Sequence, residues 1–319
     1  MKMSAIPASA RPRPRPVPGR ARVRAVLAAL AVVAAAAVAA CSNTSSPGPS
    51  TVPDGSPSAS PSSGPASTPA IGEIDHATGA TDVVFRFEEG GGFVPMDFFA
   101  TEAPIFTLYG DGTVIFKDGT AAPPPDRDGI SRMPAYQTVK LSEDEIQAFL
   151  RYAVADGGLG VARAQYAGPG ADLPTATFTI IAAGQTKTVS VMALGMDREA
   201  DPDMLVLEAL AGLGDKVRGF GLEVDDEVPW TPDRWRGVLT PDAFNPPRDW
   251  PWPNVAPADF IQHPEPGAPQ FPVRTMTSAE IEALGFDEIE GGFSGLSLTG
   301  PDGKLYLFAL RPLFPDEAF

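Results

Sequence analysis

The sequence predicts an α+β fold in which an antiparallel sheet of hairpins packs two helices on one face. Three observations support this prediction. β-rich runs flank tight turns in two places, two capped segments repeat apolar residues at helical spacing, and the elements follow one another over residues 80–227 as strands, helix, strand pair and helix. A Pro/Trp-rich segment and a small α+β tail with a C-terminal hairpin follow over residues 228–319.

The predicted strands alternate apolar and polar residues, which is the pattern of a half-buried sheet. They cover residues 82–88, 104–109, 113–116, 137–141, 175–182 and 187–194. Gly110-Asp111-Gly112 separates the second run from the third, and Ala183-Gly184-Gln185 separates the last two runs. Glycine at such positions permits tight turns, so both pairs are predicted to be β-hairpins.

The two predicted helices begin at capping residues. Ser142 and Glu145 have the spacing of a capping box, and Gly157-Gly158 ends the first helix. Asp201-Pro202-Asp203 begins the second helix, because proline is well tolerated in a first turn. The apolar faces are Ile146, Phe149, Leu150 and Ala153 in the first helix, and Leu207, Leu210, Leu213 and Val217 in the second.

The tail has a different composition. All four tryptophans and twelve prolines lie in residues 228–272, where proline limits regular structure. A short capped helix from Thr277 and a hairpin about residues 301–303 follow. We expect Trp230 and Trp235 to be core residues, and Trp250 and Trp252 to be partly exposed and to contact a ligand.

The first 40 residues have the pattern of a secretory signal peptide. Seven basic and no acidic side chains lie in residues 1–24, and residues 25–40 form an apolar run of 16, short of the roughly 20 needed to span a membrane. The run ends in Val38-Ala39-Ala40-Cys41, which resembles the lipobox of bacterial lipoproteins. The resemblance implies that Cys41 carries lipid and anchors the mature chain to the outer face of the cell membrane. An uncleaved membrane helix before a free thiol is the alternative.

Residues 41–79 form a predicted linker of Ser, Pro, Gly, Thr and Ala, whose few apolar groups do not offset the entropy of ordering. We expect it to be disordered, with His76 as a solvated residue near its end. Without the leader, 17 basic and 40 acidic side chains remain, a net charge of about −23. Such a charge disfavours nucleic acid, whose phosphates need basic groups. We expect a monomer that meets the membrane through its lipid anchor.

Two resemblances to known families add to this interpretation. Residues 108–115, LYGDGTVI, and residues 311–317, RPLFPDE, resemble strings of uncharacterised secreted lipoproteins of actinobacteria. That family is uncharacterised, so the resemblance implies no activity for this chain. The layout of residues 140–217, in which a capped helix, a loop with Tyr166, a strand pair and a closing helix follow one another, is similar to emfourin-type inhibitors of thermolysin-like metallopeptidases.

Residue counts exclude most catalytic chemistry. One cysteine and two histidines, His76 and His263, cannot form a disulfide framework, a zinc finger or a three-histidine site. The glycines match neither a nucleophile elbow nor a nucleotide-binding loop. We therefore expect no catalytic residue, no metal and no cofactor.

Three functions remain open. The favoured one is a non-catalytic binding or interaction module whose partner is an envelope protein or a glycan, contacted by Trp250 and Trp252. The alternative is a proteinaceous inhibitor of a metallopeptidase. The third is a hydrolase of cell-wall polymer that uses a carboxylate pair, which needs two acidic groups beside an aromatic platform. Its candidate residues are Asp233, Asp242, Asp249 and Asp259.

Overall fold

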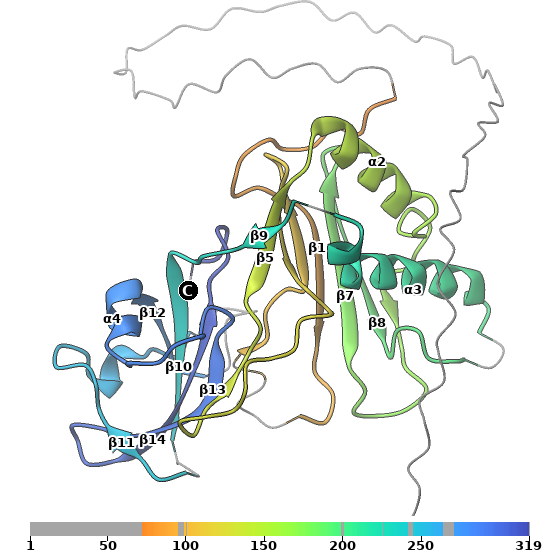
Figure 1. Cartoon of the computed structure of the whole chain (residues 1–319). Coiled ribbons are helices and arrows are strands. Elements are labelled where there is room, and N and C mark those ends of the chain that lie inside the picture. The colour runs from red at the N-terminus through yellow and green to blue at the C-terminus, as the bar shows by residue number, and fades with distance from the viewer. Residues whose placement is uncertain are drawn as a thin grey trace, which may run out of the picture. The chain divides into compact units, whose positions relative to one another are not determined.

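The structure is a computed structural model, shown in Figure 1. It describes residues 72–94, 99, 101–198, 201–224, 226–241, 245–263 and 271–318. The predicted signal peptide, Cys41, most of the predicted linker and Asp242 lie outside the described residues. The described part contains two large, mainly antiparallel sheets and a few helices, which confirms the predicted α+β class.

The first sheet has eight strands in the order β6-β8-β7-β1-β2-β3-β5-β9. They are β1 (Val83–Gly90), β2 (Phe106–Tyr109), β3 (Thr113–Lys117), β5 (Tyr136–Lys140), β6 (Gln165–Tyr166), β7 (Thr175–Ala182), β8 (Gln185–Met192) and β9 (Val228–Pro229). The predicted hairpins are confirmed as β2–β3 and β7–β8. Strand β1 pairs with β2 on one side and with β7 on the other, so it joins the hairpins into one sheet.

Helices α2 (Glu143–Val154) and α3 (Met204–Arg218) pack against one face of the first sheet, as predicted (Figure 1). The capping box of α2 is present: the backbone N–H and the hydroxyl of Ser142 donate to the Glu145 carboxylate at 2.8 and 2.7 Å. Phe149 of α2 meets Phe85 and Phe106 of the sheet at ring-centroid distances of 4.9 and 5.6 Å. Helix α2 and the sheet thus share one aromatic core.

The second sheet has six strands, ordered β11-β13-β14-β10-β12, with β4 paired to β13. They are β4 (Ser131–Arg132), β10 (Arg234–Pro241), β11 (Arg248–Asp249), β12 (Val273–Thr277), β13 (Phe293–Thr299) and β14 (Leu305–Pro312). The short helices are η1 (Phe220–Leu222), η2 (Pro257–Asp259) and α4 (Ser278–Glu282). Strands β13 and β14 form the predicted last hairpin.

Pairing crosses the predicted domain boundary between residues 227 and 228. Strand β4 lies between β3 and β5 in the sequence but belongs to the second sheet, whereas β9 follows the boundary and pairs with β5 of the first sheet. Each sheet therefore contains a strand from the other side of the boundary.

The face of the first sheet opposite the helices is covered by the C-terminal segment. Tyr109, Ile115, Tyr136 and Phe314 form a buried cluster there. Phe314 stacks on Trp230 with ring centroids 5.2 Å apart and meets Tyr136 edge to face at 5.1 Å. Both faces of the first sheet are thus packed.

Ordered contacts begin before residue 80. The backbone of Ile74 exchanges two hydrogen bonds with the Gln147 side chain, at 2.8 and 2.9 Å. The side chain of His76 is only 3% exposed and lies 3.2 Å from the Glu143 carboxylate. The expectation that His76 is a solvated linker residue is therefore wrong, because α2 provides a surface that covers it.

Candidate functional site

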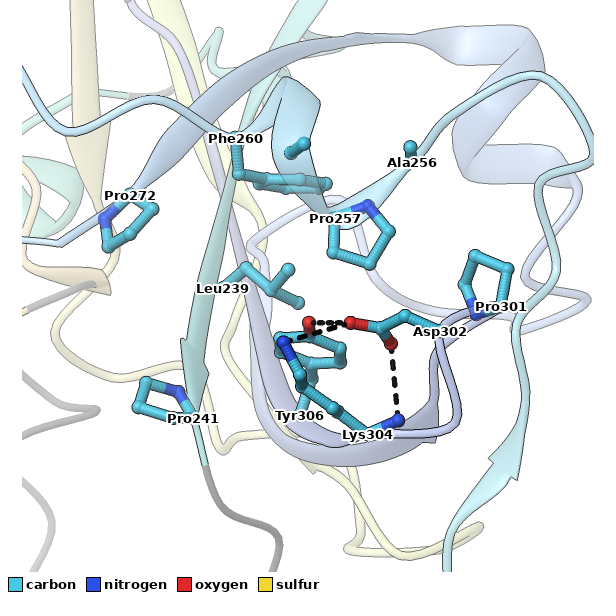
Figure 2. Close-up of a pocket in the computed structure, with 11 residues that line it drawn as sticks. Leu239, Pro241, Ala256, Pro257, Phe260, Pro272, Pro301, Asp302, Lys304 and Tyr306 are labelled. Carbon is cyan, nitrogen blue, oxygen red and sulfur yellow. Dashed lines mark hydrogen bonds and ion pairs between the residues drawn. The ribbon is translucent and has the colours of Figure 1, made fainter.

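Two adjoining hollows lie on the second sheet and its loops. The apolar hollow, about 620 Å³, is lined mainly by Leu239, Pro257, Phe260, Pro272 and Tyr306 (Figure 2). The tryptophan hollow, about 630 Å³, is lined by residues that include Asp249, Trp250, Trp252, Asn254, Asp259 and Thr299. Ala256 and Pro301 line both hollows, so the two adjoin.

Indole hydrogen bonds fix the loop that separates the hollows. Prolines at 251, 253 and 257 remove backbone donors, so this segment cannot form a long ladder. Instead, Trp250 Nε1 donates to the carbonyl of Val255 at 2.6 Å, and Trp252 Nε1 donates to that of Glu280 at 2.7 Å. The two rings meet edge to face, with centroids 5.1 Å apart. The walls of the hollows are therefore held by specific contacts.

The structure divides the four tryptophans differently from the sequence prediction. Trp235 is 5% exposed, which confirms its core position, and Trp230 is half-buried against Phe314. Trp250 is half-buried, so its predicted partial exposure is confirmed. Trp252 is only 3% exposed, and its predicted exposure is wrong because its ring packs on Phe308 at 5.1 Å. A ligand contact by Trp250 or Trp252 stays a prediction.

Hydrogen bonds hold the polar rim of the apolar hollow. Figure 2 shows the Asp302 carboxylate, whose Oδ2 accepts from the Tyr306 hydroxyl at 2.8 Å and lies 3.4 Å from the Lys304 ammonium. The bond from Tyr306 is the main cause that lowers the pKa of Asp302, and the Lys304 N–H adds to it. Asp302 is therefore an ionised acceptor at neutral pH.

The predicted carboxylates are only partly brought together. Asp249 and Asp259 both line the tryptophan hollow, whereas Asp233 lines neither hollow. Asp259 accepts the N–H of Ala256 at 2.8 Å and caps η2. Both acids in the hollow are exposed, unlike the apolar surroundings that a glycosidase provides for its general acid.

The RPLFPDE string contributes to a largely buried polar group that the sequence analysis did not assign. We name it the C-terminal clamp: Arg86, Tyr109, Arg311, Asp316 and Glu317. Arg311 donates two hydrogen bonds to the Glu317 carboxylate, at 2.8 and 2.6 Å. Asp316 accepts from Arg86 and from the Tyr109 hydroxyl, each at 2.7 Å. The clamp ties the end of the chain to β1 and β2.

Charge pairing outweighs desolvation at Glu317 of the clamp. Burial alone would raise the pKa of Glu317, but hydrogen bonds from Arg311 and from the Phe314 N–H lower it overall. Burial raises the pKa of Tyr109 far above its ordinary value, and Asp316 adds to the rise. Nearby, burial and the charge of Arg311 lower the pKa of Arg236 to about 10. These paired, enclosed groups support a structural role.

Other features of the described residues bear on function. No helix among them is long and apolar enough to cross a membrane. No group of three His, Cys, Asp or Glu side chains among them is placed to hold a metal ion. His263 is half-buried and lines neither hollow.

The fold and the hollows define an α+β protein of two sheets, with a paired surface depression on the second sheet. Comparison with protein-family models, curated proteins and solved structures gives no match to this chain. The resemblances to the actinobacterial lipoproteins and to emfourin-type inhibitors stay predictions.

Proposed function

We propose that this protein is a non-catalytic binding module, anchored by lipid on Cys41 to the outer face of the cell membrane, and that its tryptophan hollow binds a glycan of the cell envelope. The observation that carries the glycan assignment is the combination of Trp250 with Asp249, Asn254 and Thr299 around one open hollow.

The chemistry of this lining suits a sugar ring. The C–H face of a sugar packs on an indole ring, while its hydroxyls need acceptors and donors at the edge. Trp250 supplies the ring, Asp249 an acceptor, Asn254 both kinds of group and Thr299 a hydroxyl. The volume of about 630 Å³ falls within the range of small-ligand sites.

The adjoining apolar hollow supports an oligomer as the ligand. Its lining is dominated by proline, leucine and aromatic side chains, which suit methyl groups such as those of N-acetylated sugars. Among the described residues that line either hollow, Lys304 is the only cation, against Asp249, Asp259 and Asp302. The charge balance therefore favours an uncharged glycan over an anionic polymer.

The test is a titration of the chain with soluble oligomers of N-acetylated amino sugars, followed by calorimetry and by tryptophan fluorescence. Asp249→Ala and Asn254→Ala should each weaken binding by about 5- to 13-fold, since one hydrogen bond contributes about 1 to 1.5 kcal/mol. Both residues are exposed, so the melting temperature should stay unchanged. Asp233→Ala, outside both hollows, is the matched control and should bind like the wild type.

Other outcomes would overturn the proposal. Absence of saturable binding, or equal binding by both hollow variants and the control, would remove the glycan assignment. Release of shortened oligomers would show the hydrolase instead. Loss of thermolysin-like peptidase activity at stoichiometric amounts of this protein, without glycan binding, would show the inhibitor.

A further inference from the structure

Lys117 differs from the other lysines in the described part of the chain. Each of those lysines has its ammonium group near a carboxylate or a carbonyl oxygen: Lys140 with Asp111, Lys187 with Gly160, Lys216 with Glu223 and Lys304 with Asp302. Lys117 makes no such contact within the described residues. Its Nζ lies over the ring of Tyr136, 5.5 Å from the ring centroid.

The fold places this amine at the edge of the first sheet's second face. Lys117 ends β3 and pairs in register with Tyr136 of β5. It is half-buried and lines a hollow of about 300 Å³ together with Glu89 and Glu102. None of the described residues lines both this hollow and either of the two on the second sheet.

Both carboxylates in this hollow are already engaged. Arg218 donates to Glu89 through Nε at 3.0 Å and through a second guanidinium nitrogen. Glu102 accepts the backbone N–H of Gly91 at 2.8 Å. Neither carboxylate forms an ion pair with Lys117, so among the described residues this lysine lines the hollow without a direct counter-charge.

Burial and a neighbouring charge favour the neutral amine. Burial lowers the pKa of Lys117, and the positive charge of Arg311 lowers it further, while Glu102 and Glu89 oppose the change without cancelling it. The Tyr136 phenol beside the amine has a pKa raised by burial, so it stays neutral, although its ring face attracts a cation and so opposes loss of the proton. A lysine in such surroundings is a stronger nucleophile at neutral pH than a solvated one.

We propose that Lys117 is a covalent capture site for small aldehydes. The amine nitrogen attacks the carbonyl carbon and forms a carbinolamine; loss of water, which takes the carbonyl oxygen and two hydrogens, then gives an imine. No oxidant or reductant is needed, and addition of water reverses the reaction. The hollow of about 300 Å³ lies at the lower end of ligand-site volumes, which favours a small aldehyde over a large one.

The test uses the full chain, glycolaldehyde as the probe and cyanoborohydride to trap imines as stable amines. Peptide mass spectrometry then gives the labelling rate of each lysine between pH 6 and pH 9. At pH 7, Lys117 should be labelled several-fold faster than Lys140, Lys187, Lys216 or Lys304. Its rate should also reach half of its maximum at a lower pH than theirs.

One variant tests whether the labelling of Lys117 depends on the pKa of its amine and not only on how accessible the amine is. Glu102→Gln keeps an oxygen that accepts the Gly91 N–H but removes a negative charge that raises the pKa of Lys117. The labelling profile of Lys117 should therefore move to lower pH, while that of Lys187 stays unchanged.

Two results would overturn the proposal. One is a Lys117 rate no higher than those of the paired lysines. The other is a combination of two observations: acetate protects Lys117 from labelling, and the pH profile of Lys117 labelling does not move in Glu102→Gln. Lys117 would then be a charged group that binds anions.

Discussion

Replacing Phe314 by alanine removes the ring that joins the C-terminal segment to the first sheet. The side chain is 0% exposed, and its ring lies 5.1 Å from Tyr136, 5.2 Å from Trp230 and 5.9 Å from the guanidinium of Arg86. Truncation of a buried phenylalanine costs about 3 to 5 kcal/mol. Because two aromatic pairs and a cation–π contact are lost together, we expect the upper end, about 5 kcal/mol.

Calorimetry measures this cost as a shift in melting temperature. For a folded part of this size, 1 kcal/mol corresponds to about 2 to 4 °C, so Phe314→Ala should lower the melting temperature by about 10 to 20 °C. Phe93→Ala makes the same substitution at a side chain that is 92% exposed, and it should shift the melt by about 2 °C or less.

Two observations would refute this reasoning. If Phe314→Ala and Phe93→Ala shifted the melt equally, the C-terminal segment would not hold the sheet. If the wild-type chain melted in two separate transitions, the two sheets would be independent, in conflict with the strands they exchange.

The buried groups and the sequence support three more tests. The lowered pKa of Glu317 stabilises the fold above the unfolded-state value of about 4.3, and this contribution is lost as pH falls through the folded pKa; Glu317→Gln should therefore flatten the acid dependence of the melting temperature. Trp252→Ala should cost about 3 to 5 kcal/mol in denaturant unfolding, since the side chain is 3% exposed. Cys41→Ser should leave an unlipidated, uncleaved precursor by mass spectrometry, and lipid-free processing of the wild type would contradict the anchor.

The sequence predicted the elements whose signals are local. Period-two alternation and glycine turns located the hairpins, and the Ser142 box and apolar spacing located α2. The two-residue strands β4, β6, β9 and β11 were not predicted, because two residues carry no period and their pairing depends on distant partners. Strand β12 was not predicted either. It directly follows the proline-rich stretch, so its start was not distinguished from that segment.

Burial was harder to predict than secondary structure. The composition of this segment predicted the same partial exposure for Trp250 and Trp252. Their exposure differs because Trp252 packs on Phe308 and donates to the Glu280 carbonyl. The clamp could not be predicted from RPLFPDE alone, since its partner Arg86 is 230 residues from Asp316. What the sequence did show was the chemistry available in the hollows, but not its arrangement.

The 230 residues between Arg86 and Asp316 affect the order of events during folding. The bond between Arg86 and Asp316, and the pairing of β4 with β13, require residues near the end of the chain. The first sheet therefore cannot cover its second face until residues 293–317 have emerged from the ribosome. Folds dominated by such distant contacts form slowly. A chain exported as we propose would gain from this delay, because it must cross the membrane before it folds.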